Sequence, residues 1–324
     1  MQPIDAQQVH ELLEFDGLIA ALHQAHLGGM PKHNARYIFE DPRPEGQPDV
    51  FITLLAWQPG EGILSKLVTS FPGNRERHGG PTVNSSYVFV DGESGVPRAI
   101  VDGEAMIFRK TAADSALGAK ILVRDDAETM LMVGAGALAP YLVAAHIVAS
   151  PSLRRVRIWN RTLENANRLA AKLHDDGLDV AAVRDLPSAL EAADLVVSAT
   201  MATEPIITGV NLKPGAHVSL IGSFTPQMRE SDDAVLQRAS IFVDHRQCTE
   251  RSGEFLGPFA RGVITPDDVR GDLFELCQGS VAGRTSPSEI TMIKIGGGSY
   301  MDYFATKYLI DCLDGRPFAT TCSS

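Results

Sequence analysis

The chain has 324 residues, of which 44% are hydrophobic and 21% are charged, and its net charge is −11 at pH 7. This composition predicts an ordinary globular protein with two domains or one large domain. The acidic charge argues against nucleic acid or an anionic membrane surface as the main partner. The first residues lack the basic and apolar regions of a signal peptide, and no apolar run is long enough for a membrane span. We therefore expect a cytoplasmic protein.

The cysteines and histidines form no pattern that indicates a metal site. No two cysteines have the C-x-x-C spacing, and the nine histidines form no ligand set. We expect no metal, and we expect scattered thiols in a reducing compartment. The four cysteines are Cys248, Cys277, Cys312 and Cys322.

The first hundred residues predict a helix followed by an antiparallel sheet. Residues 5–28 have apolar side chains at three- and four-residue steps, which is typical of an amphipathic helix. A polar, proline-rich stretch at 31–48 reads as a loop and contains Arg36. Short strand-like runs separated by Pro-Gly and Asp-Gly turns then predict a meander, with strands at 50–57, 62–71, 86–90 and 99–101.

The rest of the chain has a different pattern of predicted elements, in which strands alternate with helices. An alanine-rich helix is expected at 104–120, and from residue 129 short apolar strands alternate with helices, which is typical of a parallel sheet. A long helix is expected at 299–313. The predicted class is α/β, with a Rossmann-type dinucleotide-binding domain at 119–298 inserted in an α+β domain made of 1–118 and 299–324.

One glycine turn in the inserted domain predicts a dinucleotide site. The apolar run 130–133 leads into Gly134 and Gly136, a helix follows at 137–150, and a second strand follows at 156–159. Gly134 allows a tight turn, and Gly136 allows the backbone to approach a pyrophosphate at the helix N-terminus. The third position of the motif is Ala139, which is small enough for close packing of helix and strand. Ala137 and Leu138 complete the expected pyrophosphate turn.

The end of the second strand predicts which cofactor binds. A site for NAD usually has a carboxylate there, whereas an arginine accommodates the 2′-phosphate of NADP. This chain has Asn160, Arg161 and Thr162, with no carboxylate before Glu164. The pattern favours NADPH, while NADH stays possible.

Several segments together resemble the ornithine cyclodeaminase/mu-crystallin family, in the order in which they occur in that family. The segments are SKLV at 65–68, TAA at 111–113 with Ser115, VRIWNRTLEN at 156–165, ATEPI at 202–206 and LKPGAHV at 212–218. They fall within about residues 30–305. The VRIWNRT segment is most similar to the mu-crystallin branch, which contains NADPH-dependent ketimine reductases.

The resemblance implies a homodimer whose N-terminal sheet domain binds substrate and forms the dimer. It also implies that three cations hold the substrate carboxylate. Two correspond to Arg36 and Lys66. At the third position the family has arginine, and the alignment places Lys110 there, with Arg109 just before it. A lysine gives a point charge rather than a planar fork, so either Lys110 or Arg109 could contact the carboxylate, and Lys110 is favoured.

Phe224 decides between reactions within the family. Ornithine cyclodeaminases have a catalytic aspartate at this place, and the GSFTP segment at 222–226 has phenylalanine instead. Phenylalanine can neither place nor deprotonate the second amine of ornithine. The segment resembles that of Δ1-pyrroline-2-carboxylate reductases.

We therefore expect NAD(P)H-dependent reduction of Δ1-pyrroline-2-carboxylate or Δ1-piperideine-2-carboxylate to L-proline or L-pipecolate, with Lys66 as the catalytic proton donor or electrostatic partner. Further cofactor contacts are expected at Thr111, Thr200 and Met201. Asp302 either contacts the nicotinamide side or, as the favoured alternative, caps the last helix. The competing interpretations are an ornithine cyclodeaminase, an alanine dehydrogenase-like oxidoreductase and a non-enzymatic binding protein.

Overall fold

The computed structural model describes residues 1–43, 48–174 and 178–316, which form two compact units. Unit 1 contains Met1–Lys110 and the chain from Gly298 onward, and unit 2 contains Thr111–Gly297. The sequence placed the first boundary at 118/119, and the division into units falls after Lys110; both positions lie inside one continuous helix, α4 (Gly103–Leu122). Periodicity cannot reveal a boundary inside an unbroken helix. The roles predicted for the two parts stay predictions.

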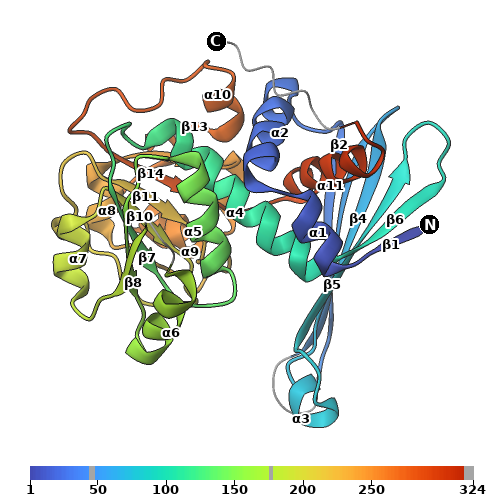
Figure 1. Ribbon diagram of the computed structural model, residues 1–324, viewed down its shortest axis with the longest axis horizontal. Helices are drawn as coiled ribbons and strands as arrows, with labels where there is room; N and C mark the ends of the chain where they lie inside the picture. The colour runs from blue at the N-terminus through green and yellow to red at the C-terminus, as the bar shows by residue number, and fades with distance from the viewer. Residues whose placement is uncertain (44–47, 175–177, 317–324) are drawn as a thin grey trace. The chain divides into compact units, whose positions relative to one another are not determined.

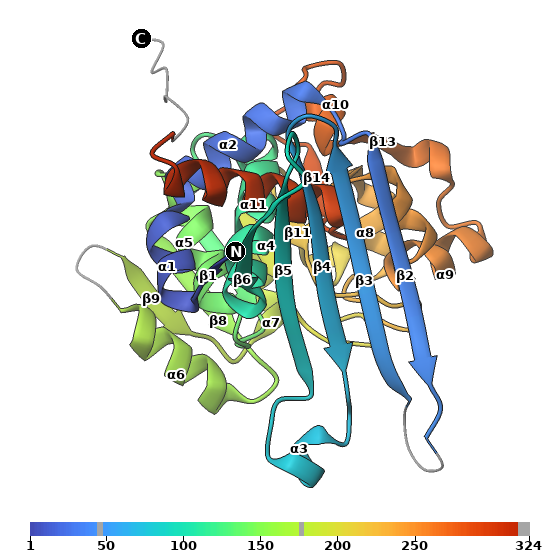
Figure 2. The same cartoon turned by 90° about the vertical axis from the view of Figure 1, so that its right-hand side faces the viewer.

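The described part of unit 1 is built on a six-stranded sheet in the order β1-β6-β5-β4-β3-β2. β1 pairs with β6 in parallel, and the other neighbours are antiparallel, as the predicted meander requires (Figure 2). The strands are β1 (Gln2–Ile4), β2 (His33–Asp41), β3 (Asp49–Gln58), β4 (Gly62–Ser70), β5 (Val83–Asp91) and β6 (Pro97–Asp102).

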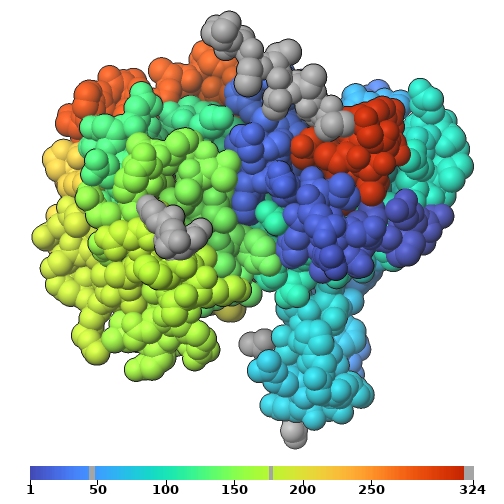
Figure 3. All heavy atoms as spheres, in the orientation of Figure 1, coloured from blue at the N-terminus to red at the C-terminus, as the bar shows by residue number. Residues whose placement is uncertain are grey.

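Besides the short helix after β4 and the first part of α4, the described part of unit 1 contains three helices, and two of them replace the single helix predicted at 5–28. α1 (Ala6–Leu12) begins with a capping box between Asp5 and Gln8, and the chain then bends before α2 (Phe15–Gly28). The third is α11 (Ser299–Leu313), which lies beside α2 in Figure 1. The short helix α3 (Asn74–His78) joins β4 to β5, and Figure 3 shows this end of the hairpin as a projection from its unit.

β2 corrects the prediction of a loop at 31–48 for residues 33–41, and residues 44–47 of the predicted loop lie outside the described residues. Residues 33–41 pair in antiparallel register with β3, so that Arg36 lies opposite Leu54. β2 is an edge strand, and almost all of its residues are exposed on both faces. A strand whose two faces are both exposed to solvent needs no alternation of apolar and polar residues. Its sequence therefore lacks the pattern from which a strand is predicted.

The described residues of unit 2 form an eight-stranded parallel sheet in the order β13-β12-β14-β11-β10-β7-β8-β9. The central strands are buried on both faces, which explains their continuous apolar sequences. The strands are β7 (Thr129–Val133), β8 (Arg155–Trp159), β9 (Asp179–Ala182), β10 (Leu195–Ser198), β11 (His217–Leu220), β12 (Ala239–Val243), β13 (Val269–Asp272) and β14 (Ile290–Lys294).

Helices connect these strands, so the carboxyl ends of all eight meet at one edge of the sheet, where ligands of doubly wound folds bind. The helices are α5 (Ala139–Ala149), α6 (Leu163–Leu173), α7 (Leu186–Ala192), α8 (Asp233–Arg238), α9 (Gly253–Arg261) and α10 (Leu273–Cys277). Within the described ranges, no helix is both long and apolar enough to cross a membrane.

Candidate active site

Lys66 lies in the middle of the unit 1 sheet, where β4 pairs with β3 on one side and β5 on the other. Its register partners are Leu54 and Tyr87. The Lys66 ammonium is 3.3 and 3.4 Å from the two carboxylate oxygens of Asp302 on α11, and its side chain is 13% exposed. Tyr87 is fully buried and donates its hydroxyl to the same carboxylate at 2.7 Å. β4 is an interior strand of the sheet, so Lys66 is not an outward-facing residue of an edge strand.

The charges around Lys66 act on its proton affinity in opposite directions. Burial lowers the pKa of Lys66 most strongly, and the Asp302 carboxylate raises it again. The positive charges of Lys110 and Arg36 lower it further. Lys110 and Arg36, the other two cations predicted to bind substrate, thus lie close enough to Lys66 to lower its pKa. The Asp302 carboxylate lies beside Lys66 as well. Such a cluster attracts an anion, because an incoming negative charge relieves the repulsion between the cations.

The two candidates for the third cation have different surroundings. Arg109 donates to the ring nitrogen Nδ1 of His10 at 3.1 Å and to the His10 carbonyl at 2.9 Å. Its guanidinium also lies 4.7 Å from the centre of the Phe15 ring. Lys110 is 5% exposed, and its charge acts on Lys66. This arrangement favours Lys110 as the carboxylate ligand, and its assignment stays a prediction.

Asp302 does not cap the last helix, so the favoured sequence interpretation is wrong. The N-cap of α11 is Gly298, with no side-chain hydrogen bond, and the Asp302 carboxylate is directed to Lys66 and Tyr87 instead. Sequence reasoning missed Tyr87. The register that places it opposite Lys66 could have indicated it, but that register was not known from the sequence.

The glycine turn of unit 2 has the geometry that a pyrophosphate requires. Gly134 has a φ of +106°, and a side chain there would meet the Ala199 carbonyl at 2.7 Å. A Cβ at Gly136 would meet nothing within 4 Å, so the space beside its backbone is open. The N-cap of α5, Leu138, makes no side-chain hydrogen bond to the first amides of the helix. These residues fit a dinucleotide pyrophosphate.

The predicted ribose-phosphate residues follow β8. The Asn160 side chain accepts from the Ala135 amide at 3.3 Å and donates to the Thr162 carbonyl at 2.9 Å, so it joins this turn to the glycine turn. Arg161 and Thr162 are exposed, and Thr162 is the N-cap of α6 without a side-chain cap bond. An exposed guanidinium next to a helix N-terminus fits a phosphate group.

The remaining predicted cofactor residues of unit 2 lie on α4 and at the carboxyl edge of the sheet. Thr111 is half-buried on α4. Thr200 and Met201 follow β10; Met201 is 74% exposed, and Thr200 is bonded to Glu230. Phe224 follows β11 and is 58% exposed. Sequence reasoning missed the buried charged residues beneath these turns, Glu230, Asp244 and Lys294.

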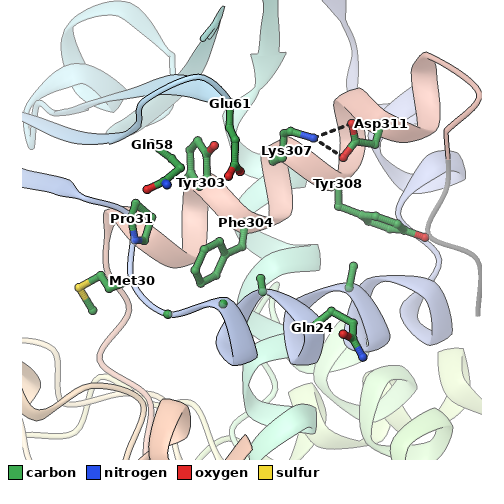
Figure 4. A pocket seen from close by; sticks show the side chains of 14 residues that line it. Gln24, Met30, Pro31, Gln58, Glu61, Tyr303, Phe304, Lys307, Tyr308 and Asp311 are labelled. Atoms are coloured by element: carbon green, nitrogen blue, oxygen red, sulfur yellow. Dashed lines mark hydrogen bonds and ion pairs between the residues drawn. The ribbon is translucent and has the colours of Figure 1, made fainter. Parts of the chain in front are cut away.

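Unit 1 also contains a cavity of about 310 Å³ between α2, α11 and the β3–β4 turn, which Figure 4 shows. Tyr303, Phe304 and Tyr308 line it, together with the ion pair of Lys307 and Asp311 at 2.7 Å. Its lining includes none of the predicted substrate residues, so it is not the predicted substrate site.

Within the described ranges, no three His, Cys, Asp or Glu side chains are arranged to hold a metal ion. Cys248, Cys277 and Cys312 carry free thiols, and Cys322 lies outside the described residues.

Comparison with known proteins agrees with the resemblance read from the sequence. The model of the ornithine cyclodeaminase/mu-crystallin family matches residues 11–316. The Δ1-pyrroline-2-carboxylate reductase of Paracoccus denitrificans is 41% identical over 304 residues, which cover 94% of each chain. The ketimine reductase mu-crystallin of Mus musculus is 31% identical over 252 residues, which cover 78% of this chain and 76% of the relative.

The fold also has a solved counterpart. The structure of the Δ1-pyrroline-2-carboxylate reductase of Thermococcus litoralis, in complex with NADH and L-proline, superposes with a TM-score of 0.88. The two sequences are 24% identical, and the match covers 97% of this chain and 98% of that one. The match of the family model over nearly the whole chain decides the classification: this protein belongs to the ornithine cyclodeaminase/mu-crystallin family.

Proposed function

We propose that this protein is an NAD(P)H-dependent reductase that acts on the C=N bond of a cyclic imino acid, Δ1-pyrroline-2-carboxylate or Δ1-piperideine-2-carboxylate, and forms L-proline or L-pipecolate. The observation that carries the proposal is that Arg36, Lys110 and the Asp302 carboxylate all lie close enough to Lys66 to act on its charge. The similarity to two reductases of this substrate class supports it.

The cationic cluster binds the substrate through its carboxylate. Arg36 and Lys110 supply positive charge for the substrate carboxylate, and Asp302 can hold the Lys66 ammonium in place. A substrate carboxylate bound by these groups fixes the ring close to the Lys66 ammonium. Such orientation lowers the entropic part of the barrier.

Lys66 then protonates the imine nitrogen. An iminium is much more electrophilic than a neutral imine, so this proton makes the ring carbon reactive. Burial lowers the pKa of Lys66, which makes its ammonium a stronger acid than an exposed lysine. Asp302 and Tyr87 keep the amine in position after it has lost its proton. When bound, the reduced nicotinamide supplies the hydride for the imine carbon.

Phe224 favours reduction over cyclodeamination. No carboxylate stands at position 224, so this position cannot activate the second amine of a diamine substrate. The direct test follows NADPH oxidation with Δ1-pyrroline-2-carboxylate and, in parallel, ammonia release from L-ornithine with NAD. Oxidation with the imine and no ammonia supports the reductase, whereas ammonia and proline from ornithine would contradict it.

We further propose NADPH as the preferred cofactor, bound through its 2′-phosphate at Asn160, Arg161 and Thr162. Replacing Arg161 with glutamine raises KM for NADPH by roughly 10- to 100-fold, because a charge-assisted contact to phosphate is lost. KM for NADH changes little. Arg168 is also exposed and lies on the following helix, so R168Q is the matched control. Equal effects of R161Q on both cofactors would contradict the assignment.

We also propose that the protein is a cytoplasmic homodimer. Apolar side chains are exposed on neighbouring strands of unit 1, including Tyr37, Phe39 and Phe51, of which the last two stack at 5.9 Å. Such an apolar surface is unusual on a monomer. Sedimentation equilibrium should give twice the monomer mass, and a monomer at micromolar concentration would contradict the proposal.

A further inference from the structure

Three buried charged side chains lie beneath the carboxyl edge of the unit 2 sheet. Glu230, Asp244 and Lys294 are all fully buried, and the proposed reaction uses none of them. Each is bonded to a turn that follows a strand. Asp244 accepts from the Gly296 amide at 2.9 Å and also from the next amide. Burying an ionisable side chain is costly, and hydrogen bonds to the turns offset part of this cost. Burial raises the pKa of Glu230, whose Oε1 makes these contacts while its Oε2 has no hydrogen-bond partner among the described residues.

Lys294, the last residue of β14, holds the turn after β11. Its ammonium donates to the Gly222 carbonyl at 2.6 Å and to the Ile295 carbonyl at 2.7 Å. The Leu220 and Ile221 carbonyls are 3.4 Å away. The carbonyl oxygens at the end of β11 thus surround this cation. A neutral side chain of the same length would leave the strongest of these contacts unmade.

Glu230 joins the turn after β10 to the turn after β11. One of its carboxylate oxygens accepts from the Ser198 hydroxyl at 2.6 Å and from both the amide and the hydroxyl of Thr200 at 2.8 Å. Gly222 packs against the same carboxyl group, since a Cβ there would lie 2.5 Å from the Glu230 Cδ. The Glu254 carboxylate accepts from the backbone amide of Glu230 at 2.9 Å and so fixes the backbone of this residue.

The turn after β11 needs such support, because its backbone is strained. Ser223 has a φ of +51°, in the left-handed region that residues other than glycine rarely adopt. Its carbonyl accepts from the Ser252 hydroxyl at 2.6 Å. Strain of this kind persists only where the surroundings impose it, and it is common beside functional sites.

The order of the strands indicates which part of a bound dinucleotide lies near the turns after β10 and β11. The glycine turn for the pyrophosphate follows β7, and the predicted ribose-phosphate residues follow β8 on one side of it. The other end of a dinucleotide then extends to the opposite side, over the ends of β10 and β11. The turns at 200–201 and 222–224 follow those two strands.

We propose that Lys294 and Glu230 are positioning residues, which hold the turns at 200–201 and 222–224 in the geometry that receives the nicotinamide end of the cofactor. The inference rests on the proposed function, because it requires a nicotinamide dinucleotide. Turns that are ordered before binding need not be ordered by the ligand, and this raises its affinity.

The test compares E230A, E230Q and K294M with a matched control. Glutamine keeps an oxygen acceptor for the Ser198 and Thr200 donors. E230Q is therefore the conservative variant, in which the order of the turns and the affinity for NADPH should be retained. The control is D194A. Asp194 is a buried carboxylate at the amino end of β10, and it accepts from the Glu128 and Thr129 amides at 3.0 and 2.9 Å. D194A lowers stability at the other end of the same strand.

Two readouts are needed, and neither uses turnover. Hydrogen–deuterium exchange without cofactor should be faster in the turns around 200 and 222 in E230A and K294M. The dissociation constant of NADPH, measured by calorimetry, should rise by roughly 10- to 100-fold in these variants. E230Q should stay close to the wild type in both, and D194A should change the melting temperature but neither readout.

Wild-type affinity in E230A and K294M would overturn the inference, and so would an equal loss of affinity in D194A, which would indicate a general effect of stability. A wild-type protein that binds NADPH but reduces no cyclic imine would contradict the proposed reaction alone. A wild-type protein that binds no nicotinamide dinucleotide would overturn both.

Discussion

Replacing Lys66 with methionine lowers kcat/KM for the cyclic imine by roughly 10²- to 10⁴-fold, the usual contribution of a general acid. Methionine keeps the length of the side chain but removes both the proton and one of the three charges that are proposed to bind the substrate carboxylate. Steady-state NADPH oxidation measures the loss. The control is K120M, because Lys120 is exposed at the end of α4 and contributes no predicted contact. Activity within threefold of the wild type in K66M would contradict the role of Lys66.

The pH dependence provides an independent check on Lys66. In the proposed mechanism, reduction requires the ammonium form of Lys66, so kcat/KM falls as the pH rises through the pKa of this residue. Burial lowers this pKa below the ordinary lysine value, so the alkaline limb lies below about pH 10.5. Asp302 raises the pKa, so D302N should move the limb to lower pH. A limb that stays in place in D302N would show that another group titrates.

A second large effect is expected at Gly134, where alanine lowers the free energy of unfolding of unit 2 by at least about 2 kcal/mol. The φ of +106° is strained for any residue with a side chain, and the new Cβ would meet the Ala199 carbonyl at 2.7 Å. Denaturant unfolding, followed by the circular dichroism of the helices, measures the change.

Gly136 is the matched control, and it separates folding from binding. A Cβ there meets nothing within 4 Å, so G136A keeps its stability within about 0.5 kcal/mol. The same methyl group occupies the space into which the pyrophosphate is expected to fit, so NADPH binding should weaken by roughly tenfold or more. A stable G136A with unchanged affinity would place the pyrophosphate elsewhere.

The sequence predicted the parts of the fold that have a strong local pattern. The strand, glycine turn and helix around Gly134 and the helix at 299–313 agree with β7, α5 and α11. The edge strand β2 could not be predicted, because its two exposed faces show no alternation. The break between α1 and α2 was missed, because apolar spacing continues across it.

The candidate site was predictable only where a residue type stood out in its segment. Lys66 did so, as a cation within an apolar strand. Tyr87 and the pairing of Lys66 with Asp302 depend on tertiary packing between segments far apart in the chain. Glu230 lies in a run of charged residues that reads as a solvated loop, and Lys294 reads as the polar end of a strand. Their burial appears only when the carboxyl ends of β10, β11 and β14 meet.

The pairing of Lys66 with Asp302 spans 236 residues. This separation determines the order in which the two units can fold during synthesis. While the ribosome adds residues one at a time, all of unit 2 emerges between the two partners and can fold before Asp302 exists. The sheet of unit 1 must wait for Asp302, the carboxylate that Lys66 and Tyr87 contact, until α11 leaves the exit tunnel. Ribosome-bound nascent chains ending before residue 299 should therefore contain a folded unit 2 and an unfinished unit 1 sheet, which is the species that chaperones would meet.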